Sequence, residues 1–76
     1  SPIKVYVDAE NTFYLNSDPK PIQISSIDST LKKEIGDNKA IELLAYKDAN
    51  RASAYEIIRI AKQNALKVVI KTKGSK

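Results

Sequence analysis

The first residues of the chain alternate between apolar and polar side chains. Ile3, Val5 and Val7 occupy every second position, and successive side chains of a strand point to opposite faces. This spacing predicts a half-buried strand over residues 3–8. A polar turn separates it from the β-prone residues 12–15, so the two segments together predict a hairpin.

A helix is predicted after the proline-containing turn that follows the hairpin. Its apolar stripe consists of three residues spaced four apart: Ile27, Leu31 and Ile35. Ser25 and Asp28 have the spacing of a capping pair at its start. Gly36 is expected to end the helix, because glycine adopts a positive φ without strain.

A second helix is predicted later in the chain. Ser53 and Glu56 again have the spacing of a capping pair. Five residues are expected on its buried face: Ala54, Ile57, Ile58, Ala61 and Ala65. Tyr55, near its start, is expected to close the core rather than to bind a partner.

Two apolar segments flank this second helix. Residues 40–46 are nearly all apolar and predict an interior strand, and residues 68–70 predict another. A strand, a helix and a strand in this order form a right-handed crossover with parallel strands. The predicted order β-β-α-β-α-β is an α+β fold, a small mixed sheet with two helices on one face. The domain is expected to span residues 1–72, with residues 73–76 as a disordered tail.

Composition excludes several kinds of chemistry. The 76 residues include no cysteine and no histidine, which removes disulfides, thiolate nucleophiles, the common catalytic triads and the usual zinc sites. Two glycines are too few for a phosphate-binding loop. Neither a metal nor a cofactor is therefore expected.

The formal charge of +4 is unevenly distributed, because residues 59–76 carry lysine and arginine but no acid. A basic segment of this kind suits an anionic partner, although a solvated surface is the simpler interpretation.

A hydroxyl nucleophile paired with lysine is the remaining catalytic hypothesis. Ser17 with Lys20, and Ser29 with Lys32, have the Ser-x-x-Lys spacing. Lysine is frequent in this chain and produces the spacing by chance, so no catalytic residue is expected.

The open face of the predicted sheet offers a further hypothesis. Tyr6 and Tyr14 beside Lys4 have the aromatic and basic character with which single-stranded nucleic acids are bound. Tyrosines are also common in strands for their packing alone. Glu42, within an apolar strand, is expected to face either solvent or a partner chain.

The order of elements and several residues resemble a known family. The hairpin over residues 3–16 and the helix entry over residues 24–31 match its first half. The second half follows its order of a small residue, Asp, Tyr, helix, strand and Thr: Ala45, Asp48, Tyr55, Ile57, Ile58, Ala61, Ala65, Val68, Val69, Ile70 and Thr72. This pattern is similar to the periplasmic domain of the ExbD/TolR family, small anchored subunits of bacterial proton-driven envelope motors, over nearly the whole chain.

The chain departs from that family in three places. The loop between Asp48 and Tyr55 is longer, and the helix after Tyr55 is about one turn shorter. Leu66 stands where a glycine is expected after Ala65.

The resemblance implies a binding domain rather than an enzyme. The family's proteins are single-pass inner-membrane proteins whose periplasmic domain forms a homodimer beside an ExbB/TolQ-like membrane subunit. They engage a TonB- or TolA-like protein, or peptidoglycan in the Tol-type branch, and nucleic acid is not an expected partner.

Pairing of strands at an open sheet edge is the physical means that we expect for such contacts. Residues 3–7 and 67–72 are predicted to be the open edges. The predicted interface residues are Ile3, Val5, Val7, Asp48, Val68, Ile70 and Thr72. The opposing interpretation, that both strands are already paired within the monomer, stays open from the sequence.

Two other kinds of function also stay open. One is a small basic module that binds nucleic acid or an anionic surface, and the other is a secretin-type or KH-like assembly domain with similar elements.

Overall fold

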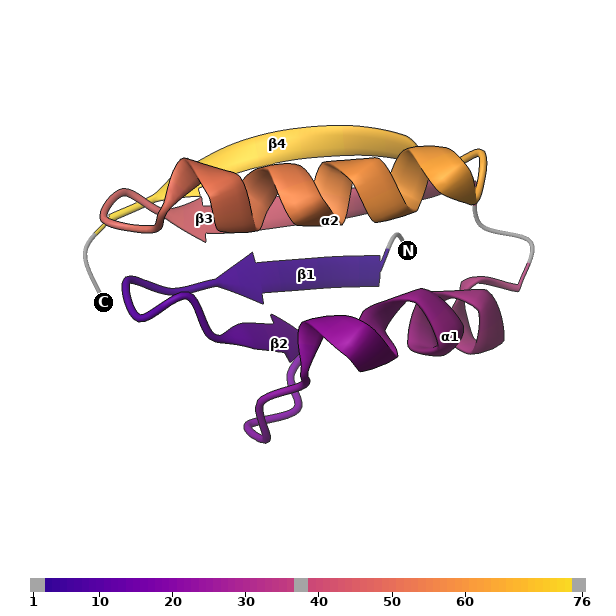
Figure 1. Ribbon diagram of the computed structural model, residues 1–76, viewed down its shortest axis with the longest axis horizontal. Coiled ribbons are helices and arrows are strands. Elements are labelled where there is room, and N and C mark those ends of the chain that lie inside the picture. The colour runs from indigo at the N-terminus through magenta and orange to yellow at the C-terminus, as the bar shows by residue number, and fades with distance from the viewer. Residues whose placement is uncertain (1–2, 37–38, 75–76) are drawn as a thin grey trace.

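The computed structural model describes residues 3–36 and 39–74. Its elements follow the order β1 (Ile3–Val7), β2 (Phe13–Leu15), α1 (Ile24–Ile35), β3 (Ala40–Tyr46), α2 (Arg51–Gln63) and β4 (Lys67–Lys73). Figure 1 shows both helices on the same face of the sheet. The predicted α+β fold and its order of elements are confirmed.

The sheet has the strand order β2-β1-β3-β4. β1 pairs antiparallel with β2 and parallel with β3, and β4 pairs parallel with β3. One row across the sheet, on the face that carries the helices, joins Leu15, Val5, Leu43 and Ile70. The neighbouring row, Tyr14, Tyr6, Leu44 and Lys71, therefore belongs to the open face.

The core lies between the sheet and the helices. Val5, Val7, Ile41 and Leu43 from the sheet are buried against a cluster from the helices that includes Ile27, Leu31, Ile57 and Ala61. These helix residues lie where the apolar periodicity predicted them. Ile60 and Leu66 are buried too, whereas Ala65, predicted to be buried, is exposed.

Both helices begin earlier than predicted. α1 has Gln23 at its N-cap, without a side-chain hydrogen bond, and Ser25 lies within the helix. α2 is capped by Asn50, whose Oδ1 accepts a hydrogen bond from the Ala52 amide at 2.7 Å. Asparagine is as good an N-cap as serine, so Asn50 begins the helix before Ser53 is reached.

The acidic residues of the two predicted capping pairs form other contacts. Asp28 lies 3.3 Å from the Lys32 ammonium and accepts a hydrogen bond from Asn64 of α2. Glu56 pairs with Arg59 at 2.7 Å. Neither carboxylate forms the predicted cap.

Both helices end at positions with unusual backbone angles. Gly36 has a φ of 53°, which agrees with its predicted role. After α2, Leu66 donates to the Ala61 carbonyl at 2.9 Å and Ala65 donates to the Lys62 carbonyl at 3.1 Å. These two hydrogen bonds form a Schellman motif, in which Ala65 takes a φ of 57°.

Two predicted boundaries need correction. β1 is an interior strand, because both β2 and β3 pair with it, so residues 3–7 are not an open edge. β4 continues to Lys73, one residue into the predicted tail, and residues 75–76 lie outside the described residues.

Candidate interaction surface

The described sheet has two edge strands, β2 and β4. β2 is three residues long, and its outer side is partly occupied, because the Ile22 amide donates to the Phe13 carbonyl at 2.8 Å. β4 is seven residues long and pairs with β3 on one side. β4 is therefore the longer and more accessible edge, as predicted for residues 67–72.

The backbone donors of β4 alternate in direction. The Lys67 amide donates to the Lys39 carbonyl at 2.7 Å, on the side of β3. Because successive amides in a strand point to opposite sides, we infer that Val68, Ile70 and Thr72 direct their amides away from β3. Among the described residues, this edge offers three spaced donors to an added strand.

Apolar side chains accompany these donors. Ile70 is 60% exposed on the helix-covered side of the sheet, and Val69 is 43% exposed on the open side. Helix α2 packs over β3 and β4 but leaves the Ile70 side chain of β4 largely uncovered. Partly buried Val68 joins the core, and Thr72 is exposed near the end of the strand.

The open-face side of β4 is basic. Lys67 and Lys71 flank Val69 on this face, and the Lys71 Nζ lies 3.2 Å from a Glu42 carboxylate oxygen. Glu42 thus lies on the open side of the sheet, where it pairs with a lysine of the neighbouring strand rather than facing solvent or a partner chain as expected.

The remaining predicted interface residues lie elsewhere. Ile3, Val5 and Val7 are buried beneath the helices, where no added strand contacts their side chains. Asp48 is exposed in the connection between β3 and α2, at the same end of the sheet as Thr72. The structure therefore keeps three of the predicted residues on the β4 edge, Val68, Ile70 and Thr72, places Asp48 in the loop after β3, and buries the three from β1.

The loop that carries Asp48 is held to the hairpin turn. The Asn50 amide donates to Asn11 Oδ1 at 3.0 Å. Asp8, which is 1% exposed, accepts hydrogen bonds from the Glu10 and Thr12 amides, both at 2.9 Å. This buried carboxylate organises the turn, and the sequence pattern did not indicate its burial.

Tyr55 does not close the core. Its side chain is 61% exposed on α2, so the expectation that it packs beneath the long loop is wrong. The helix begins at Asn50 rather than at Ser53, and Ala54 and Ile57 turn toward the core in its place. Tyr55 adds an exposed aromatic ring to the surface of α2.

Three tyrosines gather on the open face. Tyr6 and Tyr14 are cross-strand neighbours, and with Tyr46 they line a shallow hollow of about 240 Å³ next to Asn16, Ser17 and Asp18. The predicted pairing of Tyr6 with Tyr14 on this face is confirmed, and Tyr46 was missed. Asp18 contributes an acidic side chain to the lining of this hollow.

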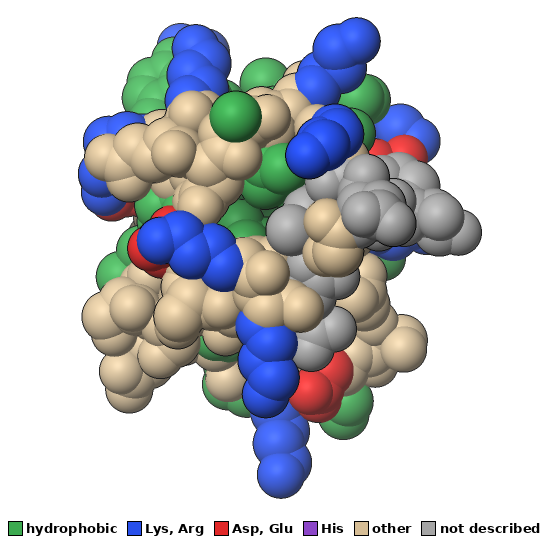
Figure 2. Space-filling model, turned by 90° about the vertical axis from the view of Figure 1, so that its right-hand side faces the viewer, with side chains coloured by type: hydrophobic (Ala, Val, Ile, Leu, Met, Phe, Trp, Pro, Cys, Tyr) green, Lys and Arg blue, Asp and Glu red, His purple; other side chains and the backbone are tan. Residues whose placement is uncertain are grey.

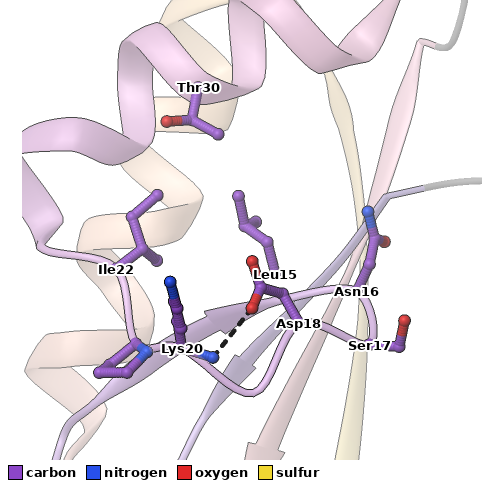
Figure 3. A pocket seen from close by; sticks show the side chains of 8 residues that line it. Leu15, Asn16, Ser17, Asp18, Lys20, Ile22 and Thr30 are labelled. Atoms are coloured by element: carbon purple, nitrogen blue, oxygen red, sulfur yellow. Dashed lines mark hydrogen bonds between the residues drawn. The ribbon is translucent and has the colours of Figure 1, made fainter.

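The Ser-x-x-Lys pairs are not assembled for catalysis. Figure 3 shows Lys20 projecting into a hollow of about 480 Å³ while Ser17 points away from it. On α1, the Ser29 hydroxyl donates to the Ser26 carbonyl at 3.2 Å, and Lys32 pairs with Asp28. Within the described residues, neither serine hydroxyl is hydrogen-bonded to its lysine.

Over residues 3–36 and 39–74, no three potential metal-binding side chains lie together in a cluster. Neither described helix has the length and apolar character needed to cross a bilayer.

Figure 2 views the end of the molecule at which β1 begins. Lysine and arginine side chains are spread over this end with apolar groups between them. They do not form one continuous basic patch there.

Comparison of the chain with models of known protein families gives no match, and comparison with curated proteins gives none either. The candidate surface is therefore defined by its geometry: a long open edge, three outward amides, two exposed apolar side chains and flanking lysines.

Proposed function

We propose that this chain is the periplasmic interaction domain of a proton-motive-force-driven envelope complex of the ExbB–ExbD–TonB or TolQ–TolR–TolA type. It belongs to a single-pass inner-membrane protein and works as a homodimer beside an ExbB/TolQ-like subunit. It engages a TonB- or TolA-like protein, or peptidoglycan in the Tol-type case, to power outer-membrane transport or envelope maintenance. It acts by binding rather than by catalysis and uses no cofactor.

The observation that supports this proposal best is the free edge of β4. An extended segment of the partner gains backbone hydrogen bonds when it adds to such an edge. The exposed side chains of Val69 and Ile70 supply apolar contacts on both sides of the added strand. A continuous row of contacts of this kind suits a domain that transmits force through its partner.

A proline substitution tests this function in the cell. Proline lacks an amide hydrogen and is tolerated in edge strands where that amide faces solvent. In the full-length protein, Ile70→Pro is expected to abolish transport across the outer membrane or detergent resistance of the envelope. Ile70→Ala, which keeps the amide, is expected to retain most of the activity.

Protein abundance and thermal unfolding serve as controls in this experiment. Val69→Pro removes an amide that points toward β3, so this variant is expected to unfold the domain where Ile70→Pro does not. Full activity of a folded Ile70→Pro variant would contradict the proposal.

The open face supports a second candidate function, binding of single-stranded nucleic acid. Tyr6, Tyr14 and Tyr46 lie together there, and exposed Lys4, two residues before Tyr6, is on the same face. Titration with a labelled single-stranded oligonucleotide tests it, because such binding weakens steeply with salt and is lost when stacking tyrosines are removed. Absence of binding at low salt would remove this candidate.

A further inference from the structure

The charge along β4 limits which strand can pair with it. Lys67 and Lys71 lie on the open-face side, two positions either side of Val69. The sequence contains no aspartate or glutamate after Glu56. Lys67 has no ion pair within the described residues, and Lys71, 55% exposed, retains donors beyond its bond to Glu42.

A second copy of β4 is a poor occupant of this edge. Antiparallel pairing of two copies keeps residues of one face together. A register centred on Val69 places Lys67 opposite Lys71 of the second copy, and one centred on Lys71 places two Lys71 residues opposite each other. Like charges in these positions are destabilising.

The register centred on Ile70 has the same difficulty. It places Lys67 opposite Lys73 of the second copy, and each Lys71 is diagonal to Lys67 and Lys71 of the second copy, about 7–8 Å away. The registers that pair most of β4 therefore all bring lysines together.

The helix-covered side of the edge requires a different chemistry. Ile70 is 60% exposed there, beside partly buried Val68, and neither side chain carries a charge. Apolar side chains of an added strand therefore suit this side.

We propose that the β4 edge binds an extended segment of another protein that carries carboxylates four residues apart, with apolar or small residues between them. The carboxylates lie opposite Lys67 and Lys71, and alternate side chains lie against Ile70. This inference rests on the proposed function, because it specifies which strand of the partner binds. It also implies that the homodimer forms through a surface other than β4.

Two matched peptides test the inference on the 76-residue chain. One contains Glu-Ile-Thr-Ile-Glu and the other Lys-Ile-Thr-Ile-Lys, with the same flanking residues. The acidic peptide forms two favourable Glu–Lys cross-strand pairs, where the basic peptide forms two unfavourable Lys–Lys pairs. The acidic peptide is therefore expected to bind with about tenfold higher affinity. Backbone amide resonances of Val68, Ile70 and Thr72 are expected to report the binding by NMR.

Neutralising variants provide the control. Lys67→Gln/Lys71→Gln is expected to bring the two affinities together and to increase the mass in light scattering at high protein concentration. Lys20→Gln/Lys33→Gln has the same change in charge away from β4, and it is expected to keep the preference and the mass of the unmodified chain.

Three results would overturn the inference. They are equal affinity of the unmodified chain for both peptides, amide shifts outside β4, and a dimer of the unmodified chain that is weakened by Lys67→Gln/Lys71→Gln. If both peptides bind β4 with equal affinity and Ile70→Pro abolishes cellular activity, the proposed function would stand. Only the preference of β4 for an acidic strand would be removed.

Discussion

Ala65 carries the least favourable backbone conformation for its residue type at the end of α2. Its φ of 57° belongs to a region in which an L-residue with a Cβ is disfavoured by about 1–2 kcal/mol. Two hydrogen bonds of the Schellman motif and buried Leu66 hold it there. Glycine is the usual residue at this position, whereas the resemblance to the ExbD/TolR family leads one to expect a glycine one residue later, at Leu66.

Ala65→Gly is therefore expected to relieve the backbone strain, while the greater conformational entropy of glycine in the unfolded chain opposes this gain. The net stabilisation is expected to be up to about 1 kcal/mol. The free energy of unfolding in urea measures the effect. Ala52→Gly, on the exposed surface of α2, is the matched control and is expected to destabilise by up to about 1 kcal/mol. Destabilisation by Ala65→Gly would contradict the assigned conformation.

Asp8 is the other residue on which local structure depends. Its buried carboxylate accepts hydrogen bonds from two amides of the turn, and hydrogen bonds to charged groups contribute about 1.5–3 kcal/mol. Asp8→Ala is expected to lower the free energy of unfolding by about 2 kcal/mol. Asp8→Asn keeps an acceptor oxygen and is expected to cost less, and equal losses in the two variants would contradict this role.

At the scale of elements, the contact between the two helices is expected to depend on pH. The hydrogen bond from the Asn64 amide holds the pKa of the Asp28 carboxyl below its ordinary value, partial desolvation opposes this, and Lys32 adds to the lowering. A carboxyl whose pKa is lower in the folded state stabilises the fold above its unfolded pKa. That contribution is lost as the pH falls through the folded pKa.

The stability of the chain is therefore expected to decrease as the pH falls below about 4. Glu56, whose pKa is lowered by Arg59, contributes in the same direction. Thermal unfolding between neutral and acidic pH is expected to show a smaller decrease in Asp28→Asn than in the unmodified chain. An unchanged pH dependence in that variant would contradict the assigned helix contact.

The sequence predicts elements well where periodicity decides them. The alternation of Ile3, Val5 and Val7 and the spacing of Ile27 and Leu31 each describe a buried face, because only one side of each element meets the core. Helix starts were predicted less well, since several polar residues near each start can accept the same amides. Asn50 and Ser53 both fit the start of α2 by residue type. In the structure Asn50 is the N-cap, because its side chain accepts the hydrogen bond from the Ala52 amide.

At the scale of the whole molecule, the pairing of strands could not be obtained from local pattern. The first strand was expected at an edge, but β2 and β3 pair on either side of it. Exposure of Tyr55 and the clustering of Tyr46 with Tyr6 likewise depend on contacts between distant segments. The edge position of β4 was predicted, and the sheet order, in which β4 pairs only with β3 among the described strands, confirms it.

The free edge of β4 is the central element of the proposed function, and amide hydrogen exchange measures it most directly. In the chain alone, we expect slow exchange of the Val69 and Lys71 amides, which point toward β3. We expect fast exchange of the Val68, Ile70 and Thr72 amides, which point away from it. Addition of the periplasmic segment of the TonB- or TolA-like protein is expected to slow exchange at these last three residues. Bound partner with unchanged exchange along β4 would contradict the proposed mode of binding.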